Sequence, residues 1–108
     1  MLSEIEYNAL IEAAFTAIED AVDNADPDLD CEGGIGMLTI DCGAGGQLIF
    51  SRQSPTRELW LAARSGGYHF ARRDGDWVCS RSARTLRDIF AQVTTEQAGG
   101  AIDLVIEA

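Results

Sequence analysis

The side chains best suited to chemistry in this sequence are carboxylates, and they gather in one stretch. Seven of them fall within fourteen residues that contain no basic residue: Glu19, Asp20, Asp23, Asp26, Asp28, Asp30 and Glu32. Neighbouring carboxylates repel by about 1 kcal/mol per pair in water, so folding alone does not favour this clustering. Their oxygens suit hard cations such as iron, manganese, magnesium or calcium. Their field would also steer a basic protein partner. The alternative is a solvated helix face that runs into a solvated loop.

Two more specific carboxylate chemistries fit the stretch poorly. Asp26, Asp28 and Asp30 match the opening of a calcium-binding EF-hand loop. The match then fails, because Cys31 stands where the loop needs glycine and Met37 where it needs glutamate. A hydrolytic carboxylate pair needs a pocket that moves two pKa values apart, and nothing in the sequence predicts one. No nucleophile motif is present, so we expect a protein that is not an enzyme.

Composition predicts one globular domain over residues 1–108, with 46% hydrophobic residues and a formal charge of −10. All eight basic residues are arginines, and eleven acidic residues precede the first of them, Arg52. Charge is therefore polarised along the chain. An acidic half argues against nucleic-acid binding, which depends on neutralising phosphates. It favours cations or a basic protein partner.

The cysteines and the termini indicate a reducing compartment. Cys31, Cys42 and Cys79 are odd in number, and no signal peptide precedes them. No apolar run approaches the roughly 20 residues of a membrane-spanning helix. We therefore expect a soluble cytoplasmic protein that does not bind membranes. Each cysteine is expected to be a small buried hydrophobic residue, because their spacing with His69 is not a zinc pattern.

The first half of the acidic stretch should lie on a helix. Ser3 is a candidate N-cap, and apolar residues follow at helical spacing: Tyr7, Ile11, Ala14, Ile18 and Val22. Glu12, Thr16, Glu19 and Asp23 share another face, with Asp20 beside them. The helix should end near Asn24, because Pro27 forbids its continuation.

From Asp28 the period changes from that of a helix to that of a strand. Asp28, Asp30 and Glu32 would then point the same way and continue the acidic surface of the helix. Further strands are predicted over residues 37–42, 47–53, 57–63, 68–73 and 76–80. Short turns link them, so we expect an antiparallel sheet of about six strands with one face open to water.

A second helix and a tail complete the predicted fold. Ser82 is a candidate N-cap; Leu86, Ile89, Phe90 and Val93 have core-facing spacing, and Gly99-Gly100 should end the helix. The tail should lie along the core through its alternating apolar residues, Ile102, Leu104 and Ile106. The fold class is therefore α+β, a two-layer sandwich with both helices on one face of the sheet.

The open face of that sheet should carry an exposed tryptophan. Alternation places Trp60 outward, as an interface anchor unless another segment covers it. His69 should share this face as a solvated or sheet-packed side chain, while Trp77 should belong to the core.

Four blocks in the second half of the chain have a distinctive sequence: Arg52-Gln53-Ser54-Pro55, Glu58-Leu59-Trp60-Leu61-Ala62, Ser65-Gly66-Gly67-Tyr68-His69-Phe70 and Asp76-Trp77-Val78-Cys79. In order and spacing they resemble the frataxin family, in its bacterial CyaY-type branch. The similarity covers nearly the whole chain, including the acidic first helix and the final helix.

This resemblance implies an α-β sandwich and a role in iron–sulfur cluster assembly. It implies weak, reversible binding of Fe²⁺ or Fe³⁺ by the acidic ridge, which we define as the seven carboxylates of the first paragraph. It also implies docking on the cysteine desulfurase, which bacterial members are thought to regulate, and on the scaffold protein. The partner-binding residues would be Glu12, Glu19, Asp20, Asp23, Gln53 and Trp60. Ser51 departs from the asparagine found in many members.

The resemblance therefore favours an iron chaperone or regulator of the desulfurase. It also favours a monomer that forms oligomers only with iron. Two alternatives stay open: a ferroxidase-like or iron-storing protein, and an acidic adaptor that uses no metal.

Overall fold

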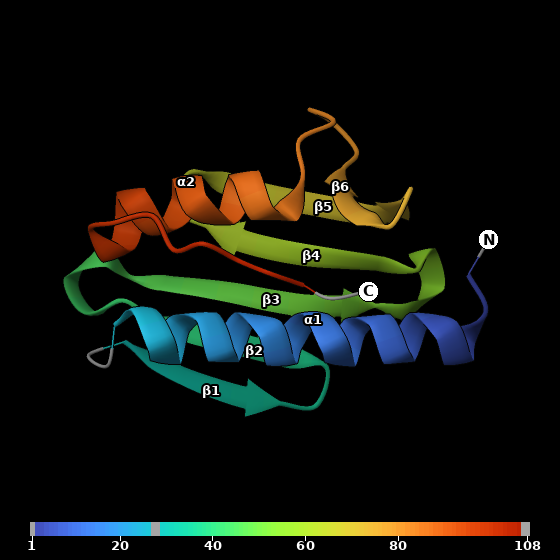
Figure 1. The fold of residues 1–108 in the computed structure, drawn as a ribbon, viewed down its shortest axis with the longest axis horizontal. Coiled ribbons are helices and arrows are strands. Elements are labelled where there is room, and N and C mark those ends of the chain that lie inside the picture. The colour runs from blue at the N-terminus through green and yellow to red at the C-terminus, as the bar shows by residue number, and fades with distance from the viewer. Residues whose placement is uncertain (1, 27–28, 107–108) are drawn as a thin grey trace.

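The computed structural model describes residues 2–26 and 29–106, which form two helices and a six-stranded sheet (Figure 1). The helices are α1 (Glu4–Ala25) and α2 (Leu86–Ala98). The strands are β1 (Asp30–Gly34), β2 (Met37–Asp41), β3 (Gln47–Gln53), β4 (Glu58–Ala63), β5 (Gly66–Arg73) and β6 (Asp76–Cys79). Short 3-10 turns, Gly43–Gly45 and Ser54–Thr56, follow β2 and β3.

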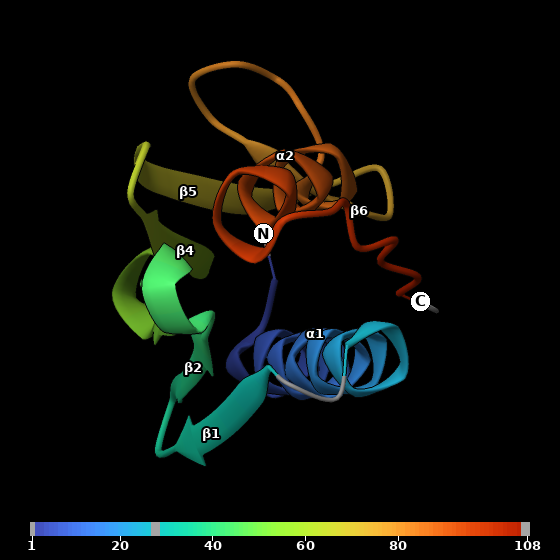
Figure 2. The same ribbon diagram turned by 90° about the vertical axis from the view of Figure 1, so that its left-hand side faces the viewer.

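The strands lie in sequence order across the sheet, and each is antiparallel to its neighbour. Figure 2 shows both helices against the same face of this sheet, and none of the described segments covers the other face. The predicted two-layer α+β sandwich is confirmed. In the described part of the chain, neither helix is long and apolar enough to cross a membrane.

Helix α1 begins where the sequence predicts it. The Glu6 amide donates to Ser3 Oγ at 3.1 Å, and the Ser3 amide donates to Glu6 Oε1 at 3.2 Å. This reciprocal pair satisfies two amides that have no partner within the helix. It also lowers the pKa of Glu6. The buried side of α1 is the predicted stripe: Tyr7, Ile11, Ala14, Ile18 and Val22.

The covered face of the sheet supplies the other half of the core. Side chains alternate along β2, β3 and β4, so that every second one is buried, for example Leu38, Phe50 and Leu61. Phe50 packs against Phe90 of α2 with ring centroids 6.0 Å apart. Trp77 is 2% exposed, as the sequence predicts for a core residue.

The buried side-chain amide of Gln97 links α2 to the start of β3 and the end of β4. Gln97 Oε1 accepts from the Arg64 amide at 2.8 Å, and Gln97 Nε2 donates to the carbonyls of Gly45 and Gln47. The approach is so close that a Cβ on Gly45 would lie 1.7 Å from the Gln97 carbonyl oxygen. Glycine is therefore required at position 45.

The C-terminal tail runs between the two helices (Figure 1). Ile102 and Leu104 are buried there, which confirms the predicted contact with the core. Thr94 Oγ1 accepts from the Ile102 amide at 2.9 Å, and Arg87 forms an ion pair with Asp103. The tail is thus held in place beside α1.

Several details differ from the sequence prediction. The N-cap of α2 is Thr85 and not Ser82, because Thr85 Oγ1 accepts from the Asp88 amide. Strand β4 begins at Glu58, since Arg57 has a left-handed backbone with φ 55°. Cys31, on the edge strand β1, and Cys42, in the connection after β2, are only half-buried.

Tyr7 joins α1 to the end of the β3–β4 hairpin. Its hydroxyl donates to the Glu58 carbonyl at 2.5 Å and accepts from the Gln53 amide at 2.9 Å. The guanidinium groups of Arg52 and Arg57 lie 5.6 and 5.8 Å from its ring centroid. Burial is the main reason why the pKa of this phenol is raised. Tyr7 therefore fixes where α1 lies along the sheet.

Replacing Tyr7 with phenylalanine should destabilise the fold by about 1–3 kcal/mol, since it removes the hydroxyl that pairs a part-buried amide and a part-buried carbonyl. Urea denaturation would measure this change. Tyr68→Phe is the matched control, because the Tyr68 hydroxyl contacts only the exposed Ser65 hydroxyl in the described structure. Equal effects of the two substitutions would contradict the role assigned to Tyr7.

Candidate functional site

The acidic side chains of α1 lie along its solvent side. Glu12, Glu19, Asp20 and Asp23 are all exposed, while the residues of the buried stripe are at most 2% exposed. Helical geometry places Glu19 and Asp23 one turn apart on the same side. The structure therefore confirms that α1 is amphipathic with an acidic outer face.

The pKa of the Cys31 thiol is affected by carboxylates of both α1 and β1. The Cys31 side chain lies on the covered side of β1, opposite Ile40 in the register. Burial, and after it the charges of Asp23, Glu19 and Asp30, raise the pKa of this thiol to about 11. These three carboxylates therefore share a field at the junction of α1 and β1.

The strand carboxylates point away from the core, as alternation predicts. Asp30 and Glu32 are exposed on either side of the half-buried Cys31. Figure 1 and Figure 2 both show β1 beside α1 at the edge of the sheet. The acidic faces of these two elements are therefore adjacent and together cover one edge of the molecule.

The two remaining members of the acidic ridge lie in the connection between α1 and β1. Asp26 is the C-cap residue of α1, half-buried, and its amide donates to the Val22 carbonyl at 3.0 Å. Asp28 lies outside the described residues, so its predicted alignment with Asp30 and Glu32 stays a prediction.

The structure adds an eighth carboxylate that the sequence analysis missed. Asp41 is exposed on β2, directly opposite Asp30 on β1. Like charges at opposed positions are destabilising, so this pair adds to the cost of the acidic surface. The turn Ile35-Gly36 could have revealed Asp41 from the sequence. A two-residue turn pairs Gly34 with Met37, and that register places Asp30 opposite Asp41.

The carboxylates are not arranged as a closed metal site. Among residues 2–26 and 29–106, no three His, Cys, Asp or Glu side chains are close enough to hold a metal ion together. A cation on this surface would meet one or two protein ligands and complete its coordination with water. Such binding is weak and exchanges readily.

The open face of the sheet carries an aromatic pair. The rings of Trp60 and His69 stack with centroids 4.0 Å apart and planes 9° from parallel. Trp60 Nε1 donates to Glu58 Oε1 at 3.0 Å, which holds the indole in one orientation. Trp60 is therefore half-buried, and none of the described segments lies over its face of the sheet (Figure 2). The stack was missed, although the cross-strand pairing of positions 60 and 69 follows from the short turn between β4 and β5.

Gln53 and Trp60 lie on the same face of adjacent strands. Gln53 is opposite Glu58, while Ser51 is opposite Trp60, so Gln53 and Trp60 are diagonal neighbours. The structure brings these two predicted partner-binding residues together. It places them on a different surface from the carboxylates of α1.

Comparison with known proteins gives one consistent result. Residues 1–100 match the family described as "Frataxin-like domain". The chain is 44% identical over 104 residues to the "Iron-sulfur cluster assembly protein CyaY" of Ectopseudomonas mendocina, covering 94% of each chain. It is 39% identical to the protein of the same name from Neisseria meningitidis serogroup B, covering 96% and 97% of the two chains. Its fold is similar to the frataxin of Psychromonas ingrahamii, with a TM-score of 0.86, 23% identity, and coverage of 94% and 97%.

The Cys31 thiol should report the charge of its carboxylate neighbours. With a pKa near 11 it is almost wholly protonated at pH 8.5, so alkylation by iodoacetamide should be slow. Glu19→Gln/Asp23→Asn should lower the pKa and speed alkylation several-fold at that pH. Alkylation would be followed by mass spectrometry in a background of Cys42→Ser and Cys79→Ala. Asp76→Asn/Glu96→Gln, which removes two carboxylates elsewhere, should leave the rate unchanged; a rate that rises equally in both would contradict the local field.

Proposed function

The chain belongs to the frataxin-like domain family, and from this premise we propose that it is a non-catalytic protein of iron–sulfur cluster assembly. The observation that carries the proposal is the exposed acidic surface where α1 meets β1. The names of relatives that match almost the whole chain support the same process. We further propose that the protein delivers iron, regulates the cysteine desulfurase, or does both.

Iron would be the cargo of the acidic ridge: Glu19, Asp20, Asp23, Asp26, Asp28, Asp30 and Glu32. Carboxylate oxygens are suitable ligands for Fe²⁺ and Fe³⁺. Because no three of the described side chains converge, each ion would be bound loosely and reversibly. Loose binding suits a protein that must release iron to an acceptor. Cargo binding would neutralise part of the ridge, so oligomers should form only when iron is present.

The same charges would dock the protein on a basic surface of the cysteine desulfurase. Exposed charges at the edge of an interface mainly raise the association rate and fix orientation. Glu12, Glu19, Asp20 and Asp23 lie along one helix and supply such a field. Trp60 and Gln53, on the open face of the sheet, would contact the scaffold protein or the assembled complex.

A ferroxidase-like or iron-storing protein is the alternative. Oxidation of Fe²⁺ at a dinuclear centre needs ligands that bridge two metal ions at a defined distance. The described carboxylates face solvent and do not converge, which favours a chaperone or regulator over a ferroxidase.

Charge reversal should show whether the acidic face of α1, and not net charge alone, binds the desulfurase. Glu19→Lys/Asp23→Lys should weaken calorimetric binding to the cysteine desulfurase, without iron, by at least tenfold, since it replaces attraction by repulsion. Asp76→Lys/Glu96→Lys changes the net charge equally at exposed positions away from α1. This control should bind within about threefold of the native protein. Equal loss in both variants would show that only net charge matters, and equal binding would remove the ridge from the interface.

Dioxygen uptake during Fe²⁺ addition distinguishes a chaperone from a ferroxidase. The native protein should consume dioxygen no faster than Glu19→Gln/Asp23→Asn, because an open surface does not assemble a bridged pair of irons. An oxygen electrode measures both rates. Saturable uptake by the native protein that the variant lacks would establish the alternative function.

A further inference from the structure

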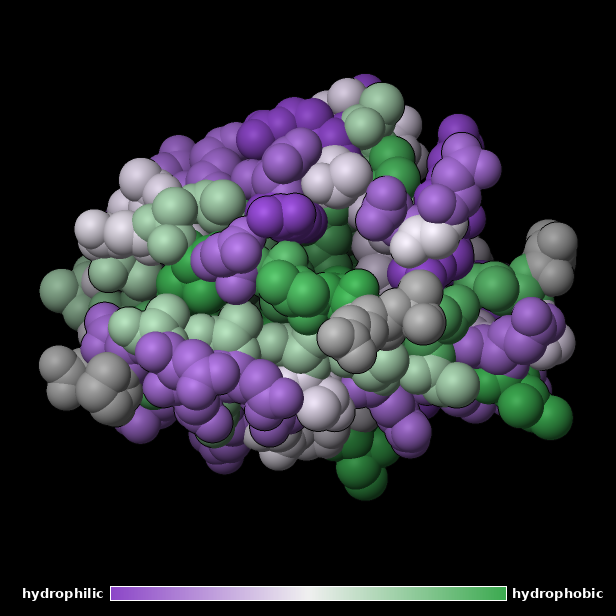
Figure 3. Space-filling model, viewed as in Figure 1, coloured by the Kyte–Doolittle hydropathy of each residue, from purple (hydrophilic) through white to green (hydrophobic). Residues whose placement is uncertain are grey.

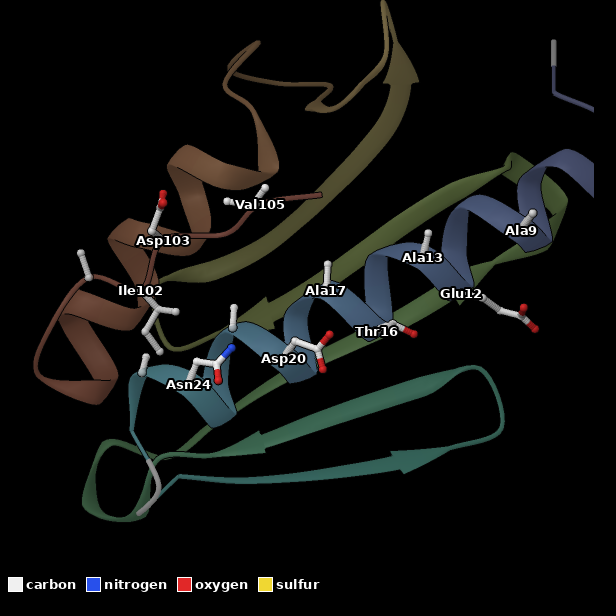
Figure 4. Close-up of a pocket in the computed structure, with 13 residues that line it drawn as sticks. Ala9, Glu12, Ala13, Thr16, Ala17, Asp20, Asn24, Ile102, Asp103 and Val105 are labelled. Carbon is white, nitrogen blue, oxygen red and sulfur yellow. The ribbon is translucent and has the colours of Figure 1, made fainter. Parts of the chain in front are cut away.

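The two faces of the molecule present different side chains to a partner. On the helix side, a hollow of about 900 Å³ lies between α1 and the C-terminal tail, and Figure 3 shows hydrophobic surface in it. Alanines form much of its α1 side, and Figure 4 labels Ala9, Ala13 and Ala17 among them. The described residues that line this hollow include no aromatic side chain. The open face of the sheet, by contrast, carries the half-buried indole of Trp60 beside the exposed ring of His69.

Glu58 holds this indole from two positions earlier on the same strand. Side chains two residues apart on a strand lie on the same face of the sheet, so Glu58 and Trp60 are neighbours on the open face. Glu58 Oε1 accepts a hydrogen bond from Trp60 Nε1 at 3.0 Å. A carboxylate oxygen is a stronger acceptor than a neutral group. The polar end of the indole is therefore attached to its own strand.

The neighbouring strands support the indole on one side only. Trp60 lies opposite His69 on β5 and opposite Ser51 on β3. The His69 ring stacks on the indole at 4.0 Å, whereas a serine side chain is far too small to cover an indole face. In the described part of the chain, the orientation of the indole therefore depends on the hydrogen bond to Glu58 and the stack on His69.

The backbone of Glu58 is fixed from the covered side of the sheet. Its carbonyl accepts from the Tyr7 hydroxyl at 2.5 Å, and the same hydroxyl accepts from the amide of Gln53, the residue opposite Glu58. The side chain of Glu58 therefore starts from a backbone position that buried contacts of α1 hold in place. The position of Trp60 is thus determined by contacts on both faces of the sheet.

We propose that Glu58 is a positioning residue for docking: it keeps Trp60 in its binding orientation before the partner arrives. Immobilising a side chain on binding lowers affinity, and a side chain that is already ordered avoids this cost. Tryptophan is among the side chains that contribute most at interfaces, so its order matters most. The inference rests on the proposed function, in which Trp60 contacts the scaffold protein or the assembled complex. It adds that Glu58 acts through Trp60 and not by touching the partner.

NMR of the chain alone tests the hydrogen bond. The chain has two tryptophans, so a ¹⁵N-labelled sample gives two indole N–H signals, which Trp60→Ala would assign. Glu58→Ala should speed exchange of the Trp60 indole proton with water several-fold. The Trp77 signal is the internal reference, because Trp77 Nε1 is buried without a hydrogen-bond partner in the described structure. Glu58→Gln, which keeps an acceptor oxygen, should restore slow exchange, and the backbone amide signals would show that each variant is folded. Unchanged exchange in Glu58→Ala would overturn the proposal.

A double-mutant cycle tests whether Glu58 acts through Trp60. Binding to the preformed complex of scaffold protein and desulfurase would be measured by calorimetry without iron. Trp60→Ala should weaken binding at least tenfold, and Glu58→Ala about three- to tenfold, the effect of one side chain that must be ordered on binding. Glu58→Gln should bind within twofold of the native protein. In the Trp60→Ala background, Glu58→Ala should have no further effect, because no indole is left to position.

A matched control separates positioning from charge. Glu96→Ala removes the same side chain from an exposed position on α2 and should bind like the native protein. Equal loss in Glu58→Ala and Glu96→Ala would overturn the proposal, as would a loss from Glu58→Ala that persists without Trp60, which would indicate direct contact with the partner. Failure of this inference alone would appear as weak binding by Trp60→Ala but native binding by Glu58→Ala. If the native chain does not bind the complex, the proposed function fails and the docking role of Glu58 fails with it.

Discussion

The hydrogen bonds of the Tyr7 hydroxyl determine where the acidic surface lies. They attach the first turns of α1 to the end of the β3–β4 hairpin, and Tyr7 also packs edge-on against Trp77 with centroids 6.5 Å apart. A helix is stiff and rises about 1.5 Å per residue, so anchoring its first turns also fixes where its last turns lie. There Glu19 and Asp23 come to lie beside Cys31 on β1. The aromatic contact at one end therefore sets the electrostatics at the other.

The fold also keeps its arginines apart from that surface. The guanidinium groups of Arg52 and Arg57 lie over the Tyr7 ring, and that of Arg72 lies 5.7 Å from the Trp77 ring. Such contacts stabilise a cation against an aromatic face without a carboxylate partner. Among the described residues, the ion pair that forms joins Arg87 of α2 to Asp103 of the C-terminal tail. Glu19, Asp20, Asp23, Asp30 and Glu32 therefore form no ion pair with an arginine in the described part of the chain.

The local sequence pattern was sufficient to predict the layers of the fold. It was not sufficient to predict the register between strands. The i, i+3, i+4 spacing of Tyr7, Ile11 and Ala14 predicts a buried helix face, and the alternation of Leu48 with Phe50 predicts a sheet with one covered side. Asp41 and the Trp60–His69 stack were missed because they depend on which residues pair across strands. The hollow of about 900 Å³ between α1 and the C-terminal tail was missed for a related reason. Its α1 side is a row of alanines from Ala9 to Ala25 that is visible in the sequence, but its opposite side is the tail, some eighty residues later in the chain.

The position of β1 at the edge of the sheet has a consequence for solubility. Its outer backbone groups have no neighbouring strand in the described sheet, so they offer a template for pairing with another chain. Asp30 and Glu32 place negative charge along this edge, and two such edges repel each other. The same charges would attract a metal cargo, and a bound cation cancels the repulsion. If the proposed function is correct, cargo loading would therefore oppose protection of the edge, and the concentration of loaded protein would limit how long it stays monomeric.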